Sequence, residues 1–495
     1  SRFIEFDLKN DVYNHYQSLC PLFYKKNRTG DLMSRITEDV SKVRMYVGPA
    51  IMYSINTVTL FIIVIVFMFS ISPYLTIYSL LPLPILSFTI YTLSKKIHSK
   101  STFVQEKLAK LSTFSQEVFS GIKIIKTFNM QEIVTENFDD LSKSSKKSSI
   151  SLSKVQALFF PLMILLIGIS NIIVIYVGGN QYIDGKIEIG VIAEFIIYIT
   201  MLTWPVAVVG WVTSIIQQAE ASQKRINTFL KTAPSIKNYG KSSNLESSKI
   251  TFKNVSFKYP KTKSYALERI NFTIDSGKTL GIIGKTGSGK TSILELIMRS
   301  YDVSSGKIYL GNKELSSYNL KSLNSFISYI PQNPFLFSDT IQENIKFGNF
   351  KANKNEVIKV AKNASIHSDI YTFKDKYETL LGERGVNLSG GQIQRVTIAR
   401  ALLKKSKILL LDDCLSSVDA KTEKNILREM RKTKIDETVI IVSHKISSIM
   451  HADLIIVIDK GVIIEKGSHK KLLSNNGFYK KLAQKQLENT DIVKM

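Results

Sequence analysis

Apolar residues are concentrated in the first half of the chain, in runs long enough to cross a lipid bilayer. Residues 45–94 contain no Asp, Glu, Lys, Arg or His. Because helices of soluble domains run roughly 8–20 residues and need a polar face, a purely soluble protein is disfavoured. A bilayer core of ~30 Å needs about 20 apolar residues in a helix. Four stretches meet this requirement: residues 50–71, 74–94, 155–179 and 189–216.

The charges between these stretches predict their orientation. The turn at 71–74 has no charged residue and the turn at 179–188 has three, whereas the connection 95–154 carries eleven lysines and six acidic residues. Positively charged loops stay in the cytoplasm. We therefore expect a multi-pass protein of the plasma (inner) membrane in which residues 1–49, 95–154 and everything after the fourth span are cytoplasmic.

The long cytoplasmic connection has the composition of helices. Residues 95–154 contain no proline and one glycine, Gly121. At ~1.5 Å per residue, 30 helical residues would reach ~45 Å beyond the membrane. We expect such stalk helices, with turns near 128–136 and, in the N-terminal part, near 30–38. An ordinary cytoplasmic loop remains the alternative.

One acidic residue, Glu194, falls inside the fourth apolar stretch. A carboxylate in a span is a functional-site candidate because burying its charge in lipid is costly. Glu194 also lies near the outer end of its span, where its side chain could reach water. Both readings stay open.

The second half of the chain has a different pattern. Residues 232–248 are rich in Ser, Lys and Asn, which is typical of a linker. After them, short β-branched runs alternate with helical stretches, which indicates an α/β domain. We predict an α-helical transmembrane domain over residues 1–231, a linker, an α/β domain over 249–485 and a C-terminal tail over 486–495.

The strongest motif opens this second domain. The sequence GKTGSGKT follows the apolar run 279–283 and precedes a helical run. Strand, glycine-rich loop and helix in this order form a phosphate-binding loop, whose backbone N–H groups and helix N-terminus surround the phosphates. Lys290 would reach the β- and γ-phosphates, and Thr291 would hold Mg²⁺. The loop residues expected to bind nucleotide are Gly284, Lys285, Thr286, Gly287, Ser288, Gly289, Lys290 and Thr291.

A second acidic element follows further along the chain. The apolar run 408–411 ends in Asp412, and a carboxylate at a strand end beside the loop is what Mg²⁺ requires. The residues therefore predict a Mg²⁺-dependent nucleoside triphosphatase joined to a membrane domain.

Composition excludes several other classes. The net charge is +25, which is compatible with nucleic acid or an anionic membrane surface as a partner. Lysine is abundant throughout, however, and no nucleic-acid-binding motif occurs, so we expect solvated lysines and no nucleic-acid partner. An apolar content of 44% excludes disorder, and two cysteines, Cys20 and Cys414, exclude a disulfide scaffold.

Between the loop and the Asp412 strand stands LSGGQ, at residues 388–392. Together these elements resemble the nucleotide-binding domain of ATP-binding-cassette (ABC) transporters, over about residues 249–485. Further motifs of that family follow in its order and spacing. They are Tyr259 in VSFKY, Gln332 in YIPQNP, LLGERG at 380–385 (the exporter X-loop), Asp419 in SSVDA (the D-loop) and His444 in IIVSHK.

The resemblance implies a role for each motif. Tyr259 would stack on adenine, Gln332 would sense Mg²⁺ and contact the membrane domain, and His444 would contact the γ-phosphate. Asp412, Thr291 and Gln332 would be the Mg²⁺ ligands. In the family, LSGGQ of one subunit closes on ATP held by the other, so the functional unit is a dimer with two ATP molecules. The residues that would reach the partner's ATP are Ser389, Gly390, Gly391, Gln392 and Asp419.

The first half resembles the exporter-type membrane domain of the same family. TGDLMSRITEDV at 29–40 is similar to the first coupling helix, and IIKTFNMQE at 124–132 to the lead into the second. The family has six spans per subunit, and four are visible here. We therefore expect that the chain begins near the cytoplasmic end of the second span.

One residue departs from the family pattern. The family usually places Glu directly after the strand-end Asp as base for the attacking water, and here the residue is Asp413. Misplacing a base by ~1 Å can cost ~10²-fold in rate. An Asp here resembles the slow site of asymmetric heterodimers, which suggests a partner subunit bearing Glu. A homodimer in which Asp413 is the working base remains the alternative.

The expected function is ATP-driven export of a small amphipathic molecule or lipid, because exporter membrane domains are fused ahead of the cassette, as here. A second hypothesis is an ATP-gated channel or a regulatory subunit without transport. A specialised peptide or protein exporter is a third. The spans consist of generic Ile, Leu, Phe and Ser and do not identify the cargo.

Overall fold

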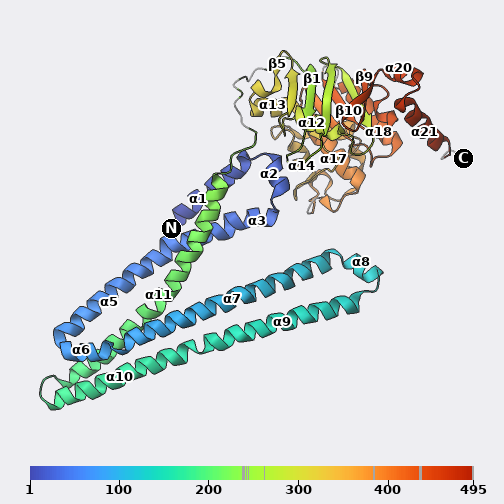
Figure 1. Ribbon diagram of the computed structural model, residues 1–495. Helices are drawn as coiled ribbons and strands as arrows, with labels where there is room; N and C mark the ends of the chain where they lie inside the picture. Colours follow the sequence, from blue (N-terminus) through green and yellow to red (C-terminus); the bar gives the residue numbers. More distant parts are fainter. Residues whose placement is uncertain are drawn as a thin grey trace. The chain divides into compact units, whose positions relative to one another are not determined.

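The computed structural model describes residues 1–236, 240, 242, 245–260, 262–382, 385–433 and 437–492. The chain forms two compact units, of which the first comprises Ser1–Leu19 and Tyr24–Ala233 and the second Cys20–Phe23 and the residues from Pro234 onward. The first unit is helical and the second is an α/β domain (Figure 1). The predicted fold class is therefore confirmed.

Four helical stretches among the described residues are long and apolar enough to cross a membrane, as predicted. They are Thr29–Ile71, Pro73–Ser120, Gln131–Ile183 and Ile189–Leu230.

The helices up to Leu230 are α1 (Arg2–Ser18), α2 (Pro21–Lys26), α3 (Thr29–Ser34), α4 (Val40–Met45), α5 (Ile51–Ile71), α6 (Pro73–Leu80), α7 (Pro82–Ser120), α8 (Ile122–Thr127), α9 (Gln131–Ala157), α10 (Phe159–Ile183) and α11 (Ile189–Leu230), with π-helical turns at Arg35–Asp39 and Tyr46–Ala50.

Proline explains where these helices break. Ser72 ends α5 in an extended conformation, and its Oγ accepts the Leu75 N–H at 3.3 Å to cap α6. The second apolar stretch, expected as one span, is divided at Leu81 into α6 and α7 because Pro82 has no N–H to continue the ladder. The third is divided at Leu158, where Pro161 follows closely.

The expected long helices are present. Helix α7 has 39 residues and lies side by side with α9, which has 27 (Figure 1). The turn between α8 and α9 falls at residues 128–130, inside the range predicted for it. The N-terminal turn expected near 30–38 was misplaced: Gly30 is helical, and the break lies at residues 27–28, where Arg28 is extended.

The second unit contains two sheets. The larger has the strand order β10-β9-β3-β8-β7-β6, with β9, β3, β8, β7 and β6 parallel and β10 antiparallel at the edge; the smaller is antiparallel, in the order β2-β1-β4-β5. The strands are β1 (Ile250–Phe257), β2 (Leu267–Ile274), β3 (Thr279–Gly284), β4 (Ser305–Leu310), β5 (Lys313–Glu314), β6 (Ile327–Ile330), β7 (Ile408–Asp412), β8 (Thr438–Val442), β9 (Leu454–Asp459) and β10 (Val462–Gly467).

The apolar sequence of the central strands reflects their burial in the larger sheet. Strand β7 is buried at every position, which is typical of a parallel strand covered on both faces. The helices of this unit are α12 (Lys290–Ile297), α13 (Leu320–Phe326), α14 (Ile341–Lys346), α15 (Lys354–Asn363), α16 (His367–Thr372), α17 (Gly390–Leu403), α18 (Ala420–Thr433), α19 (Ile446–Ile449), α20 (His469–Ser474) and α21 (Phe478–Ile492).

The short segment Cys20–Phe23 belongs to the second unit. Leu22 packs against the hydrophobic cluster of β1 and β2, and Cys20 Sγ lies 2.6 Å from Ser235 Oγ. The residues that resemble the first coupling helix, 29–40, belong to the first unit, as the rest of the helical half does. Residues 20–23, which the sequence did not single out, are part of the α/β unit.

A partly buried arginine organises the loop that follows β6. Arg400, on α17, donates from Nε to the Asn344 carbonyl (2.8 Å), from Nη2 to Asn344 Oδ1 (2.9 Å) and from Nη1 to the Phe335 carbonyl (2.9 Å). Asn344, 1% exposed, in turn donates to the carbonyls of Phe337 and Thr340 at 3.0 Å each. Burial lowers the pKa of Arg400 to about 10. One guanidinium thus fixes the loop between β6 and α14.

We predict that Arg400→Ala destabilises the protein by about 2–4 kcal/mol, because three charge-assisted bonds are lost and buried acceptors are left unpaired. Urea unfolding of the full chain in detergent measures the effect. Arg428→Ala is the matched control, since that side chain is 65% exposed with an ion pair at 3.7 Å and should change stability by less than about 0.5 kcal/mol. Equal effects of the two changes would contradict the prediction.

Candidate functional site

Four neighbouring parallel strands, β6, β7, β8 and β3, end at the same edge of the larger sheet. Loops that leave the carboxyl ends of such strands meet in one crevice. Here they enclose a cavity of about 300 Å³. It is lined by Tyr259, Ala266, Thr286, Gly287, Ser288, Gly289, Lys290, Thr291, Ser292, Gln332, Asp412, Asp413, Val442 and His444. Most residues predicted to bind nucleotide and Mg²⁺ are therefore brought together.

Three positions of the loop after β3 favour glycine, because of either a positive φ or a close backbone approach. Gly287 and Gly289 have φ of +76° and +101°, and a Cβ on Gly289 would lie 2.5 Å from the Ala266 carbonyl oxygen. A Cβ on Gly284 would lie 2.1 Å from the carbonyl oxygen of Ile458. Ser288 Oγ is buried without a hydrogen-bond partner. The loop is thus a tight turn with a buried hydroxyl that a phosphate oxygen could pair with.

Lys290 folds back over this loop. Its Nζ donates to the carbonyls of Gly284 at 2.9 Å and Lys285 at 2.8 Å. Burial lowers its pKa, and the charges of Asp413 and Asp412 oppose that shift. A buried ammonium with only carbonyl partners is well placed to pair with an anionic ligand. Lys285, in contrast, points its Nζ toward the ring of Phe478, 5.8 Å away, and does not line the cavity.

Asp412 stands beside the first turn of α12. Its Oδ1 accepts the Thr291 hydroxyl at 3.1 Å and its Oδ2 accepts the Tyr329 hydroxyl at 3.2 Å. Burial raises the pKa of Asp412, and the neighbouring charge of Asp413 adds to the shift.

Mg²⁺ prefers oxygen ligands and usually keeps waters and substrate phosphates in its shell. A carboxylate, the Thr291 hydroxyl and the nearby amide of Gln332 fit this requirement. Among the described residues, no group of three or more His, Cys, Asp or Glu side chains is placed to hold a metal ion.

Asp413 and His444 face each other across β7 and β8. The backbone N–H of Asp413 donates to the Val442 carbonyl at 2.9 Å, and the His444 N–H points to Asp413 Oδ1 at 3.4 Å. Asp413 has φ of +45°, an uncommon backbone for a residue other than glycine. These contacts hold both side chains at the cavity wall.

Sequence reasoning missed a residue that supports this wall. Residues 486–492, expected as a tail, continue helix α21. Gln486 donates to the His444 carbonyl at 2.8 Å and accepts the Ile446 N–H at 2.9 Å. No local motif marks a glutamine in a C-terminal helix as the support of a loop far away in the sequence.

Tyr259 lines the other end of the cavity. Its ring packs edge-on against Phe257 (4.7 Å) and Tyr301 (5.2 Å). Its hydroxyl donates to Glu295 Oε2 at 2.5 Å. Burial and this bond raise the pKa of Tyr259. Glu295, which orients the ring, was not predicted from the sequence.

The LSGGQ residues lie elsewhere. Ser389, Gly390, Gly391 and Gln392 do not line the cavity, and Ser389 and Gly390 are exposed. Ser389 caps α17 in a reciprocal pair with Gln392, and Gln392 donates to Asp369 Oδ2 at 3.1 Å. The start of α17 is therefore rigid and faces outward.

Asp419 is also exposed and outside the cavity. It accepts the N–H groups of Lys421 (3.1 Å) and Thr422 (3.0 Å) at the start of α18, and these bonds lower its pKa. Within the X-loop motif at 380–385, residues 383 and 384 lie outside the described residues.

Comparisons with known proteins agree with this geometry. Residues 2–206 match the family model for the ABC transporter transmembrane region, and residues 267–416 match that for ABC transporter. A multidrug resistance-like ATP-binding protein, MdlA, of Buchnera aphidicola (Schizaphis graminum) is 36% identical, over 98% of this chain and 84% of its own length. An ATP-dependent lipid A-core flippase of Syntrophus aciditrophicus is 33% identical, over 98% and 81%.

Among solved structures, a bacterial Atm1-family ABC exporter with ATP bound superposes with a TM-score of 0.85 and 25% identity, over 98% of this chain and 86% of that one. The four apolar helices and these relatives identify a multi-pass protein of the inner membrane. The chain is a member of the ABC transporter family, an exporter-type transmembrane region fused to an ATP-binding domain whose ATP hydrolysis is coupled to transport.

Proposed function

We propose that this exporter works as a dimer in which ATP lies between the phosphate-binding loop of one subunit and LSGGQ of the other. The observation that carries the proposal is the separation of the two motifs within one chain. Lys290, Thr291 and Asp412 line a cavity, whereas Ser389 and Gly390 are exposed outside it. Preorganised donors that face away from their own site are useful only to a second subunit.

Within each site we assign roles to the cavity residues. Lys290 and the loop amides bind the β- and γ-phosphates, Tyr259 supports the adenine, and His444 contacts the γ-phosphate. Thr291, Asp412 and Gln332 hold Mg²⁺, which neutralises phosphate charge when bound. Two observations support this assignment. The Ser288 hydroxyl has no hydrogen-bond partner, and the ammonium group of Lys290 donates only to two neutral backbone carbonyls.

Asp413 is the proposed base for the attacking water. Its carboxylate is one methylene shorter than the glutamate usual in the family, and its backbone is fixed by the bond to Val442. The side chain therefore has little freedom to reach further into the cavity. We infer a slow site and a heterodimer in which the partner subunit supplies the faster site, completed by this chain's Ser389.

The proposed cargo is a small amphipathic molecule or a lipid. The names of two relatives, a multidrug resistance-like protein and a lipid A-core flippase, support this class.

We predict that Ser389→Arg in the assembled exporter lowers ATP turnover by about 10-fold or more, because a bulky cation displaces donors aimed at the partner's γ-phosphate. Photolabelling with azido-ATP at this chain's own loop should be unchanged. Asn353→Ala, which removes a capping box of the same kind at α15, is the control and should change turnover by less than about 2-fold. Unchanged turnover in Ser389→Arg, or loss of photolabelling at the chain's own loop, would refute the dimer site.

We predict that the chain purified in lipid without a partner hydrolyses ATP slowly, and that Asp413→Glu raises its rate by about 10- to 100-fold, because the longer side chain places the base closer to the water. Steady-state ATPase rates measure this. Fast turnover by the unaltered chain that Asp413→Asn abolishes would instead establish a homodimer with Asp413 as the working base.

A further inference from the structure

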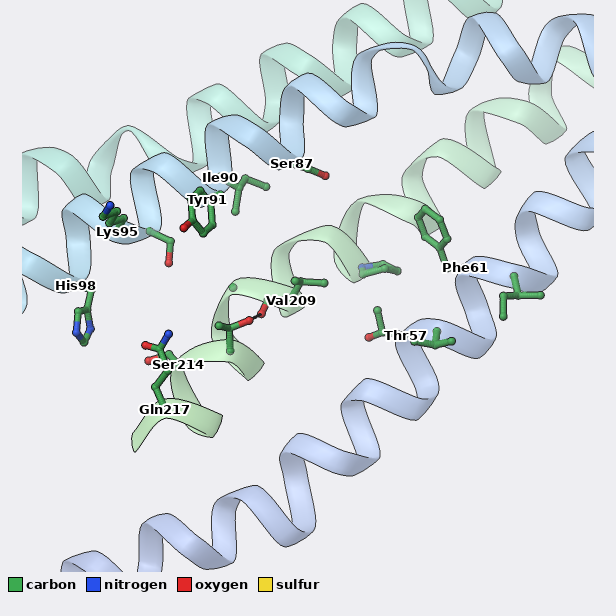
Figure 2. A pocket seen from close by; sticks show the side chains of 16 residues that line it. Thr57, Phe61, Ser87, Ile90, Tyr91, Lys95, His98, Val209, Ser214 and Gln217 are labelled. Carbon is green, nitrogen blue, oxygen red and sulfur yellow. Dashed lines mark hydrogen bonds between the residues drawn. The ribbon is translucent and has the colours of Figure 1, made fainter. Parts of the chain in front are cut away.

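The first unit has a second, larger cavity, of about 660 Å³ and open to solvent, between α5, α7 and α11 (Figure 2). Its volume lies in the range of small-molecule sites. Among its described lining residues are two basic side chains, Lys95 and His98, and no acidic one.

The two basic lining residues lie together at one end of the cavity. Figure 2 shows Lys95, His98, Ser214 and Gln217 at that end, and Phe61, Thr57 and Ser87 away from it, with Val209 between them. The basic end belongs to the part of α7 where the uncharged sequence stops, which is the cytoplasmic end of the span. The positive charge of the lining is therefore confined to the cytoplasmic end of the cavity.

The two basic residues share a helix face by their spacing. Lys95 and His98 are three positions apart, so their side chains are neighbours on α7, and Tyr91, one turn earlier, lines the same cavity. Lys96, the next residue along, does not line it. Both lysines lie where the apolar stretch ends, so their place in the sequence does not show which of them lines the cavity.

No acidic residue among the described ones lines the cavity or forms an ion pair with Lys95 or His98. Glu194, the acid of the fourth apolar stretch, does not line the cavity, and its Oε1 accepts the Tyr198 hydroxyl at 2.5 Å. Both side chains are exposed at the open side of the cavity. A positive charge beside a largely apolar surface favours a negatively charged amphiphile.

We propose that this cavity binds anionic amphiphiles, with the negatively charged head at Lys95 and His98 and the apolar tail toward Val209 and Phe61. This inference rests on the proposed export function and names the chemical class of its cargo. Ser214 and Gln217 provide polar contacts beside the head group.

The test uses two fluorescent probes with the same BODIPY-labelled dodecyl chain, one ending in a carboxylate and the other in a trimethylammonium group. Binding to the assembled exporter in phosphatidylcholine nanodiscs, without ATP, is followed by fluorescence polarisation. We expect the anionic probe to bind at least ~10-fold more tightly than the cationic one. Lys95→Gln combined with His98→Gln should weaken anionic binding by ~10-fold and leave cationic binding within ~2-fold, which also shows that the variant is folded.

Lys96→Gln is the matched control and should leave both affinities unchanged. Two results would overturn the inference. The first is equal binding of the two probes, which is expected if a carboxylate of the partner subunit neutralises the pair. The second is an equal effect of Lys96→Gln and Lys95→Gln. ATP-driven uptake of the probes into inside-out vesicles separates the two proposals. Uptake without charge preference contradicts only the cavity assignment, whereas absence of any ATP-driven uptake contradicts the export function.

Discussion

The ATP-binding domain depends on how buried charge is compensated around one phosphate-binding loop. Lys290 is buried and bonds only to carbonyl oxygens, and Asp412 is buried against two hydroxyl donors. Burial shifts the pKa of each group toward its neutral form. A triphosphate with its cation supplies the opposite charge to both, so nucleotide binding relieves an unfavourable arrangement in addition to forming new contacts.

The same compensation supports the proposed two-subunit site. The cavity residues lie at the carboxyl ends of β3 and β7, and Ser389 and Gly390 of the LSGGQ motif are exposed at the start of α17. The capping pair of Ser389 and Gln392 and the bond from Gln392 to Asp369 keep those donors ordered without ligand. Preorganised donors lose little entropy on closing, so ATP can act as the adhesive between subunits and its hydrolysis can release them.

Much of this was readable from the sequence because the signals are local. The absence of charge over residues 45–94 predicted spans, and the loop at 284–291 needs glycines whose φ angles and close approaches the structure displays. Helix breaks at Leu81 and Leu158 were missed because a proline within an apolar run leaves its hydrophobicity unchanged. The N-terminal turn predicted near 30–38 lies instead at residues 27–28.

The supporting residues could not be predicted in this way. Gln486, Glu295 and Tyr329 act on site residues through tertiary contacts, and Arg400 fixes the loop after Gln332 from another helix. Likewise, no periodicity distinguishes Lys95 from Lys96. Only the packing of α5, α7 and α11 places one of them in a cavity.

The central claim is that this chain's LSGGQ contacts ATP held by another subunit. Hydrogen–deuterium exchange of the assembled exporter, with and without Mg²⁺ and a non-hydrolysable ATP analogue, tests it most directly. The account predicts that peptides covering residues 284–291 and 388–394 both become protected when the nucleotide binds. Protection of the loop peptide alone, with the LSGGQ peptide unchanged, would contradict it.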